Sequence, residues 1–335
     1  MVIIVHSCEF FFIGENGINI RTLNDGFWVS IIDSMFRASV PLFVMASSYL
    51  LLPLKGDTVV FYKKRFVRVL IPFVIWSLLY AILPYTWNEI SLSVMKSNLI
   101  HLLYNFNNAS GHLWFVYMLI GLYLFMPVLS PWLKEVPRKL EKWFLVVWFL
   151  TTFSHYIKLF VPDILGECYW NEFGTFWYFS GFIGYLVLAH YVRIYIDWSL
   201  KKSLIVGLTL FLIGYAFTST VYYHQVQVAT ELQQLELSWR FNSFNVVLMT
   251  IGLFLIIKKI NFQSPTLYKL VQDISKLSYG MYLAHIFILN FAYRIFGGYF
   301  STPITIFLIG TVTYVVSYIV IKALSFLPKS KYIVG

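Results

Sequence analysis

Long apolar stretches recur along the whole chain and are separated by short polar segments. A helix that crosses a membrane needs about 20 mostly apolar residues. Nine stretches meet this requirement, and we expect a transmembrane helix in each of them. They are 27–54, 69–85, 113–130, 143–161, 173–192, 204–223, 241–257, 277–295 and 303–321.

A tenth apolar stretch, 2–13, is shorter than the others. As a helix it would extend about 18 Å, against about 30 Å for the hydrocarbon core of a bilayer. We expect it to be the end of a first transmembrane helix, with the chain beginning inside that helix. A signal peptide is a poorer interpretation, because no basic segment precedes the stretch and no small-residue cleavage site follows it.

The lysines and arginines are distributed unevenly among the loops. Nineteen of the 25 lie in alternate loops when 2–13 is counted as the first span. They fall within 55–68, 134–142, 193–202, 258–276 and 322–331. Loops rich in these residues stay in the cytoplasm. We therefore expect a multi-pass protein of the inner (plasma) membrane, with both termini cytoplasmic and with loops 86–111 and 224–240 outside.

The composition changes this picture little and excludes several classes of protein. Hydrophobic residues make up 59% of the 335 residues and charged residues 12%, whereas a soluble domain carries about 25% charge. This excludes a soluble enzyme, a secreted disulfide module and a disordered chain. The net charge of +10 comes from the loops assigned to the cytoplasm, so we expect no nucleic-acid partner. Cys8 and Cys168 are too few for a disulfide framework or a cysteine metal site.

The predicted fold is therefore all-α. We expect a polytopic bundle of about ten transmembrane helices. No repeat, low-complexity stretch or soluble segment interrupts the chain, so we expect one domain over 1–335.

Ionisable side chains within the expected helices are costly to bury, so each is a candidate for function. His6 lies in the apolar run Val-Ile-Ile-Val-His-Ser, and histidine titrates near neutral pH. A general base and a histidine near the water interface are both open interpretations. Glu9 shares a helical face with His6, where it would either orient the imidazole ring or form the outer rim of the helix.

Two pairs of charged residues have spacings that place them on one helical face. Asp33 and Arg37 can pair within a helix. Arg37 would then hold an anion or a developing oxyanion, or the two residues would form a structural ion pair near the interface. Arg65 and Arg68 begin a helix on the cytoplasmic side. Two guanidinium groups suit a phosphate, but the same residues also fit plain positive-inside anchoring.

Four further histidines lie in or beside the expected helices. For His285, in mid-helix, a buried histidine bonded to a neighbouring helix is the simplest interpretation. His112 opens a helix on the outer side, where an interfacial aromatic belt is the alternative to a functional role. No motif surrounds His155 or His190, and we interpret both as structural. No His-x-x-x-His or His-Glu-x-x-His pair occurs, so we expect no metal site.

Five sequence blocks follow one another over nearly the whole chain. The first ends with His6 and Ser7, and the others contain Val-Pro-Leu-Phe, Arg-x-x-Arg, His-Leu-Trp-Phe and Ser-Tyr-Gly-Met-Tyr-Leu-Ala-His. They span 2–7, 37–50, 64–72, 112–127 and 275–285. With the ending 328–335, this ordered set resembles the acyltransferase-3 family of integral membrane O-acyltransferases.

The resemblance implies an O-acetyltransferase that takes an acyl group from cytoplasmic acetyl-coenzyme A (acyl-coenzyme A) to a hydroxyl of an extracytoplasmic or lipid-linked surface glycan. Its partners would be membrane lipid and the glycan, and it would use no metal. It implies catalytic roles for His6, Arg37 and His285, coenzyme A binding by Arg65 and Arg68, and substrate binding by His112, Trp114 and Tyr49. Whether Arg37 or His285 donates to the carbonyl oxyanion stays open. So does the choice between base and acyl carrier for His6.

The chain departs from the family pattern at two places. The family's arginine upstream of the catalytic histidine is absent, because the chain starts too late, and Ser48 stands for Gly in a Ser-Gly-Tyr motif. A membrane transporter or flippase for a lipid-linked sugar is the alternative function, since it would also explain polar residues within spans. Such folds often contain internal repeats, and none is visible. A non-catalytic scaffold would leave His6 and the Arg65–Arg68 pair unexplained.

Overall fold

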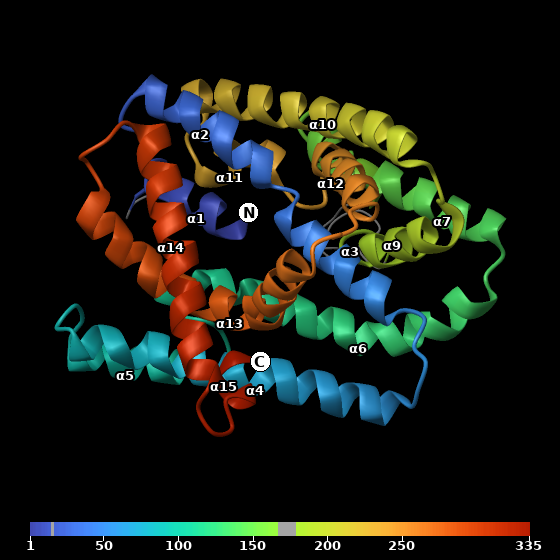
Figure 1. Ribbon diagram of the computed structural model, residues 1–335. Coiled ribbons are helices and arrows are strands. Elements are labelled where there is room, and N and C mark those ends of the chain that lie inside the picture. Colours follow the sequence, from blue (N-terminus) through green and yellow to red (C-terminus); the bar gives the residue numbers. More distant parts are fainter. Residues whose placement is uncertain (15–16, 167–178) are drawn as a thin grey trace. The chain divides into compact units, whose positions relative to one another are not determined.

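The computed structural model describes residues 1–14, 17–166 and 179–335, and their regular structure is almost entirely helical (Figure 1). The chain forms two compact units, which are described separately. Unit 1 comprises Met1–Leu54, Val128–Asn261 and Phe300–Phe307, and unit 2 comprises Lys55–Pro127, Phe262–Tyr299 and Leu308–Gly335. Cys168 and the start of the expected helix 173–192 lie outside the described residues. The single domain expected over 1–335 stays a prediction.

Unit 1 contains most of the helices and one short hairpin. Its elements are α1 (Val2–Glu9), β1 (Ile13–Gly14), β2 (Gly17–Ile18), α2 (Leu23–Phe36), α3 (Ser39–Leu51), α7 (Arg138–Thr151), α8 (Ser154–Ile157), η2 (Ile164–Gly166), α9 (Ile183–Tyr195), α10 (Leu200–Val228), α11 (Leu232–Leu235), η3 (Leu237–Trp239) and α12 (Phe244–Ile257). The strands β1 and β2 pair antiparallel, with Ile13 opposite Ile18. Within this unit α10 packs on α12 and α2, α3 packs on α9, and α1 packs on α2.

Unit 2 is built around two long helices. Its elements are α4 (Thr58–Thr86), α5 (Leu92–His101), η1 (Asn108–Leu113), α13 (Pro265–Phe296) and α15 (Lys331–Val334). The helices α6 (Trp114–Glu135) and α14 (Thr302–Ser325) are divided between the two units. Capping side chains explain where the long helices begin. Asp57 accepts a hydrogen bond from the Val60 N–H at the start of α4, and Ser264 caps α13 just before Pro265.

Six of the helices in the described parts are long and apolar enough to cross a membrane. They are Leu23–Leu51, Thr58–Thr86, Ala109–Glu135, Leu200–Val228, Leu237–Ile257 and Thr302–Ser325. The remaining expected spans, 2–13, 143–161, 173–192 and 277–295, correspond to α1, α7, α9 and α13. An all-α membrane bundle is thus confirmed, whereas a count of ten spans is not.

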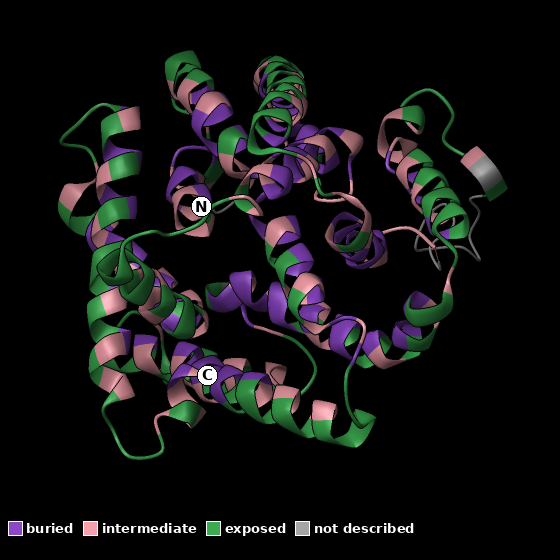
Figure 2. Ribbon diagram, turned by 45° about the vertical axis from the view of Figure 1, so that its right-hand side comes forward, coloured by how far each residue is buried: buried purple, intermediate pink, exposed green. Residues whose placement is uncertain are grey.

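Many of the helices carry both buried and exposed residues (Figure 2). Helix α10 shows how these helices suit a membrane. One side exposes large apolar residues, among them Ile205, Leu212 and Ile213. The other side is pressed against α12, where Gly207 and Gly252 approach so closely that an added Cβ would meet backbone oxygen. Small residues allow such close packing between membrane helices, where no hydrophobic effect drives association.

Two features of unit 1 add detail to the expected pattern. The span Leu23–Leu51 covers most of the apolar stretch 27–54, but it is interrupted by a turn at Arg37 and Ala38, so that α2 ends at Phe36 and α3 starts at Ser39. The segment 224–240, which we expect on the outer side of the membrane, is partly helical and partly buried within unit 1. Helix α10 continues to Val228, and Ser238 and Trp239 are buried at 0% and 2% exposure. The periodicity of apolar residues reports neither feature.

Basic residues bind the last carbonyl groups of two neighbouring helices in unit 1, α3 and α9. Arg193, near the end of α9, donates hydrogen bonds to the carbonyl oxygens of Tyr49 and Leu52 at the end of α3, at 2.8 and 2.9 Å. Lys258, just after α12, donates to the carbonyl oxygens of Val192 and Ile196 at the end of α9, at 2.8 and 2.7 Å. The C-terminal ends of α3, α9 and α12 therefore lie together, as the charge pattern requires.

Candidate functional site

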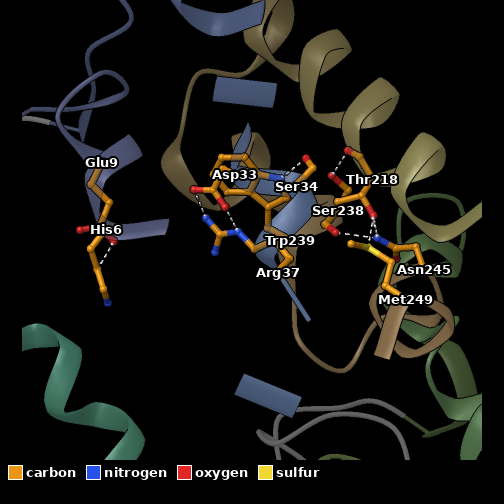
Figure 3. Close-up of polar contacts among 10 residues, drawn as sticks. All are labelled: His6, Glu9, Asp33, Ser34, Arg37, Thr218, Ser238, Trp239, Asn245 and Met249. Atoms are coloured by element: carbon orange, nitrogen blue, oxygen red, sulfur yellow. Dashed lines mark hydrogen bonds and ion pairs between the residues drawn. The ribbon is translucent and has the colours of Figure 1, made fainter. Parts of the chain in front are cut away.

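The centre of unit 1 holds a buried ion pair at the bend between α2 and α3 (Figure 3). Arg37 donates to both carboxylate oxygens of Asp33, from Nε to Oδ1 and from Nη2 to Oδ2, the latter at 2.9 Å. Asp33 is fully buried and Arg37 is 7% exposed. The spacing that suggested this pair in the sequence therefore produces it in the structure.

A tryptophan from the segment after α10 covers the guanidinium group of this pair. Arg37 lies 3.8 Å from the ring centroid of Trp239. The indole Nε1–H donates to the Ser34 hydroxyl at 3.0 Å, so the ring is tied to α2 as well. The opposite face of the indole stacks on Tyr222 with a centroid distance of 3.7 Å, and Phe12 meets it edge-on at 5.2 Å. Contacts from three parts of the chain thus fix the orientation of Trp239.

A hydrogen-bonded network supports the same segment from the other side. The Asn245 amide donates to the Ser238 carbonyl oxygen and to the Thr218 hydroxyl, each at 2.7 Å. Its side-chain oxygen accepts from the Tyr156 hydroxyl at 2.9 Å. Ser238 in turn donates from its hydroxyl to the Thr218 carbonyl oxygen at 2.9 Å. These buried polar groups satisfy one another, which a membrane interior requires.

His6 and Glu9 form a second polar pair in unit 1, on α1. The distance from His6 Nδ1 to Glu9 Oε1 is 2.8 Å, and the two side chains are 16% and 37% exposed. When Nδ1 carries the proton and donates to the carboxylate, Nε2 holds the lone pair of the ring. Asp33 and Arg37 also act electrostatically on His6. The pair therefore has the arrangement of a histidine base oriented by a carboxylate.

Glu236 adds a further carboxylate to this region, from the segment between α11 and η3. Burial raises the pKa of Glu236 above its ordinary value, and the positive charge of Arg37 partly offsets this rise. Glu9 acts on the same carboxyl group and raises its pKa further. Asp33, Glu236 and Glu9 thus all act electrostatically on the buried guanidinium of Arg37.

Unit 2 brings together two histidines from separate sequence blocks. The rings of His112 and His285 meet edge-to-face with centroids 5.1 Å apart, and Tyr80 lies 5.1 Å from His112. The His285 Nδ1–H donates to the Tyr282 carbonyl oxygen at 2.5 Å, and the Tyr282 hydroxyl donates to the His112 carbonyl oxygen. His285 is fully buried and His112 is 6% exposed. The cluster joins η1, α4 and α13.

Arg65 and Arg68 lie near the start of α4 in unit 2, one turn apart. Arg68 is exposed and Arg65 is half-buried, with its guanidinium 6.0 Å from the ring centroid of Phe61. The buried Nε–H of Arg65 has no hydrogen-bond acceptor among the described residues. An anion with several acceptor oxygens would satisfy such donors.

A family model for an acyltransferase domain matches residues 1–322. The chain belongs to the acyltransferase-3 family. With its long apolar helices, this member of the acyltransferase-3 family is a multi-pass membrane acyltransferase. No curated protein and no solved structure matches the chain.

The remaining candidate residues of this acyltransferase are Tyr49 in unit 1 and Trp114 in unit 2. Tyr49 is at the end of α3, where its ring packs on Phe254 and lies 5.6 Å from the Arg193 guanidinium. Trp114 begins α6 and meets the ring of Phe115. In the parts of the chain that are described, no group of three or more His, Cys, Asp or Glu side chains could hold a metal ion.

The two histidines interpreted as structural have polar partners in unit 1. His190 on α9 contacts the buried Glu141 of α7, with 2.8 Å between Nδ1 and Oε1. His155 lies 3.3 Å from a guanidinium nitrogen of Arg240. These contacts join neighbouring elements, and neither involves the His6 or Arg37 groups.

Several residues of the site were not singled out in the sequence. Asn245 lies within the expected span 241–257, so the rule that flags polar groups in membrane helices would have found it. Trp239 lies in the segment 224–240, which the sequence assigns to the outer side. No spacing connects it with Arg37, because the two residues are brought together by the fold of unit 1.

Proposed function

We propose that this membrane acyltransferase moves an acetyl group from cytoplasmic acyl-coenzyme A to a hydroxyl group of a surface glycan or lipid-linked sugar on the outer side. Family membership supports acyl transfer, and the basic ends of α3, α9 and α12 support a common cytoplasmic side for these helices. The observation that carries the proposal is the hydrogen bond between His6 and Glu9, which provides a carboxylate-oriented base in a membrane protein of this family.

The chemistry needs one proton acceptor and one oxyanion partner. His6 Nε2 would take the proton of the acceptor hydroxyl as its oxygen forms a bond to the thioester carbonyl carbon. The carbonyl oxygen becomes an oxyanion, and its collapse breaks the carbon–sulfur bond. The coenzyme A thiolate then takes up a proton, which balances the one held by His6. The products are the acetyl ester and free coenzyme A.

Arg37 is the group in unit 1 best suited to the developing negative charge. Two N–H groups of Arg37 donate to Asp33, and a guanidinium carries about five N–H donors. A buried cation whose orientation is already fixed needs no reorganisation during the reaction, which is the basis of electrostatic catalysis. Arg37 therefore has N–H groups beyond those given to Asp33.

The proposal is tested by following free coenzyme A thiol and labelled acetyl ester in membranes that contain the protein. His6→Gln should lower turnover by at least about 100-fold, because glutamine keeps a polar side chain but cannot act as a base. His155→Gln, a matched change on an exposed contact in the same unit, should retain most activity. A wild-type protein that moves a sugar lipid without releasing thiol would instead be a transporter, and the proposal would be wrong.

The donor is tested separately at the start of α4. Arg65→Gln with Arg68→Gln should raise the Kd for coenzyme A by at least about tenfold, since each charge-assisted phosphate bond contributes roughly 1.5–3 kcal/mol. Lys63→Gln with Lys64→Gln removes the same charge from the same turn of helix and should change the Kd little. Equal effects of the two double variants would mean that only the general positive charge matters.

A further inference from the structure

The segment 229–243, between α10 and α12, returns into the interior of unit 1 instead of remaining at the surface. Its Ser238 hydroxyl donates to the carbonyl oxygen of Thr218 on α10. Thr218 lies about 15 Å along the helix axis from the end of α10 at Val228. We refer to residues 229–243 as the re-entrant segment. Backbone of this kind is stable at membrane depth only where protein satisfies its polar groups.

The contacts of Asn245 show that the re-entrant segment is fixed. The Asn245 amide nitrogen donates to the Ser238 carbonyl oxygen and to the Thr218 hydroxyl. The Asn245 side-chain oxygen accepts from the Tyr156 hydroxyl. Asn245 and Ser238 are both fully buried. A fully satisfied buried network of this kind favours a single arrangement of the groups it joins. The residue that follows Ser238 is Trp239, whose position is therefore fixed as well.

A tryptophan in a glycan-modifying enzyme suggests a platform on which a sugar ring stacks, and the geometry argues against that role. One face of the Trp239 indole is covered by Tyr222 and the other by the Arg37 guanidinium. The indole N–H is used by Ser34. Neither face of the ring is open to a sugar. The role that remains for the ring is its contact with the Arg37 guanidinium.

Arginine side chains in membrane helices tend to extend toward water, because their long apolar stems allow the charged end to leave the hydrocarbon region. Asp33 holds one edge of the Arg37 guanidinium but lies on the same helix, so the pair could swing together. Trp239 comes from a different element and packs against the flat face of the same group. Asp33 fixes the direction in which the edge of the guanidinium points, and Trp239 fixes the tilt of its plane.

We infer that Trp239 is a positioning residue of the acyl-transfer site, with Asn245 and Ser34 fixing the indole that holds Arg37 in one orientation. This inference rests on the proposed function, since it assigns the Arg37 guanidinium to the reaction. It makes the re-entrant segment, which the sequence suggests is an outer loop, part of the catalytic apparatus. Trp239 itself touches no reacting atom.

The experiment compares two tryptophan-to-phenylalanine variants of the full chain. Trp239→Phe keeps an aromatic ring but loses the bond to Ser34. Trp148→Phe is the matched control, because Trp148 is 1% exposed in the same unit and donates from Nε1 to the Gly181 carbonyl oxygen at 2.9 Å, without contacting Arg37. Steady-state acyl transfer and thermal unfolding are measured for both variants in the same membranes or detergent.

Trp239→Phe should lower kcat by about tenfold or more and leave the KM for acyl-coenzyme A within about twofold of wild type. Trp148→Phe should lose comparable thermal stability and keep most of its kcat. Asn245→Leu should resemble Trp239→Phe, because it releases Ser238. Equal kcat values for the two tryptophan variants, or a loss confined to KM, would overturn the inference. An inactive wild-type protein would instead refute the proposed function, so the two failures are distinguishable.

Discussion

Asp33 and Arg37 are separated by a single helical turn, and both are removed from water. Burying two charges costs several kcal/mol for each ion, and their attraction compensates only when the geometry is good. Here both carboxylate oxygens are bound and the guanidinium also lies on an indole ring. Loss of one partner should therefore be much more harmful than loss of both.

Asp33→Asn is expected to destabilise the protein by roughly 3–5 kcal/mol, because Arg37 would remain buried without its counter-charge. The double variant Asp33→Leu with Arg37→Met should recover most of that loss while remaining inactive. Denaturant unfolding in detergent measures the difference. Asp197→Asn is the control, since the Asp197 side chain is 96% exposed in its pair with Lys259 and its loss should change stability little. A double variant less stable than Asp33→Asn would contradict the expectation.

Sequence spacing predicts polar pairs well when both partners lie on one helix. The His6–Glu9 and Asp33–Arg37 pairs follow from helical geometry alone and are present in the structure. The contact of Arg37 with Trp239 joins residues about two hundred positions apart and leaves no periodic trace. The same is true of the His112–His285 contact, although both residues were recognised separately.

At the scale of helices, basic residues do more than mark one side of the membrane. The last carbonyl groups of a helix have no partner within the helix and carry partial negative charge. Arg193 satisfies two of these groups at the end of α3, and Lys258 does so at the end of α9. Residues assigned from the sequence to positive-inside loops thus also hold neighbouring helix ends together.

Arg193→Gln should lower the thermal unfolding temperature measurably, since charge-assisted hydrogen bonds contribute roughly 1.5–3 kcal/mol each. The control is Lys202→Gln, which removes a charge at the same end of unit 1. Lys202 is exposed and its ammonium lies 4.5 Å from the centroid of the Trp198 ring, so loss of its charge should have a small effect. If both variants unfold at the same temperature, the capping contact contributes nothing beyond its charge.

The apolar pattern predicts the presence of helices more reliably than the positions at which they bend. Every expected span with described residues contains a helix, because a membrane leaves few alternatives for backbone hydrogen bonds. The bend at Arg37 and the re-entrant segment were not predicted. The re-entrant segment depends on hydrogen bonds between separate parts of the chain, such as those of Asn245, and hydropathy does not record such bonds.

For the whole molecule, the strongest expectation concerns the side of the membrane on which each loop lies. Gln233 on α11 is exposed on the connection assigned to the outside, and Lys201 is exposed near the start of α10 on the side assigned to the cytoplasm. In a background with Cys8 and Cys168 replaced by serine, a membrane-impermeant maleimide should label Gln233→Cys in intact cells. It should label Lys201→Cys only after permeabilisation. The reverse pattern would invert the assigned topology.

The local character of the Asp33–Arg37 pair matters for biosynthesis. An arginine near the middle of an isolated membrane helix costs about 2.5–3.5 kcal/mol to insert. Because Asp33 precedes Arg37 by one turn, the ribosome delivers the counter-charge first, and the segment can enter the bilayer as a nearly neutral unit. Trp239 emerges only after most of unit 1 has been made. In the nascent protein, Asp33 can therefore neutralise the charge of Arg37 long before Trp239 has been synthesised.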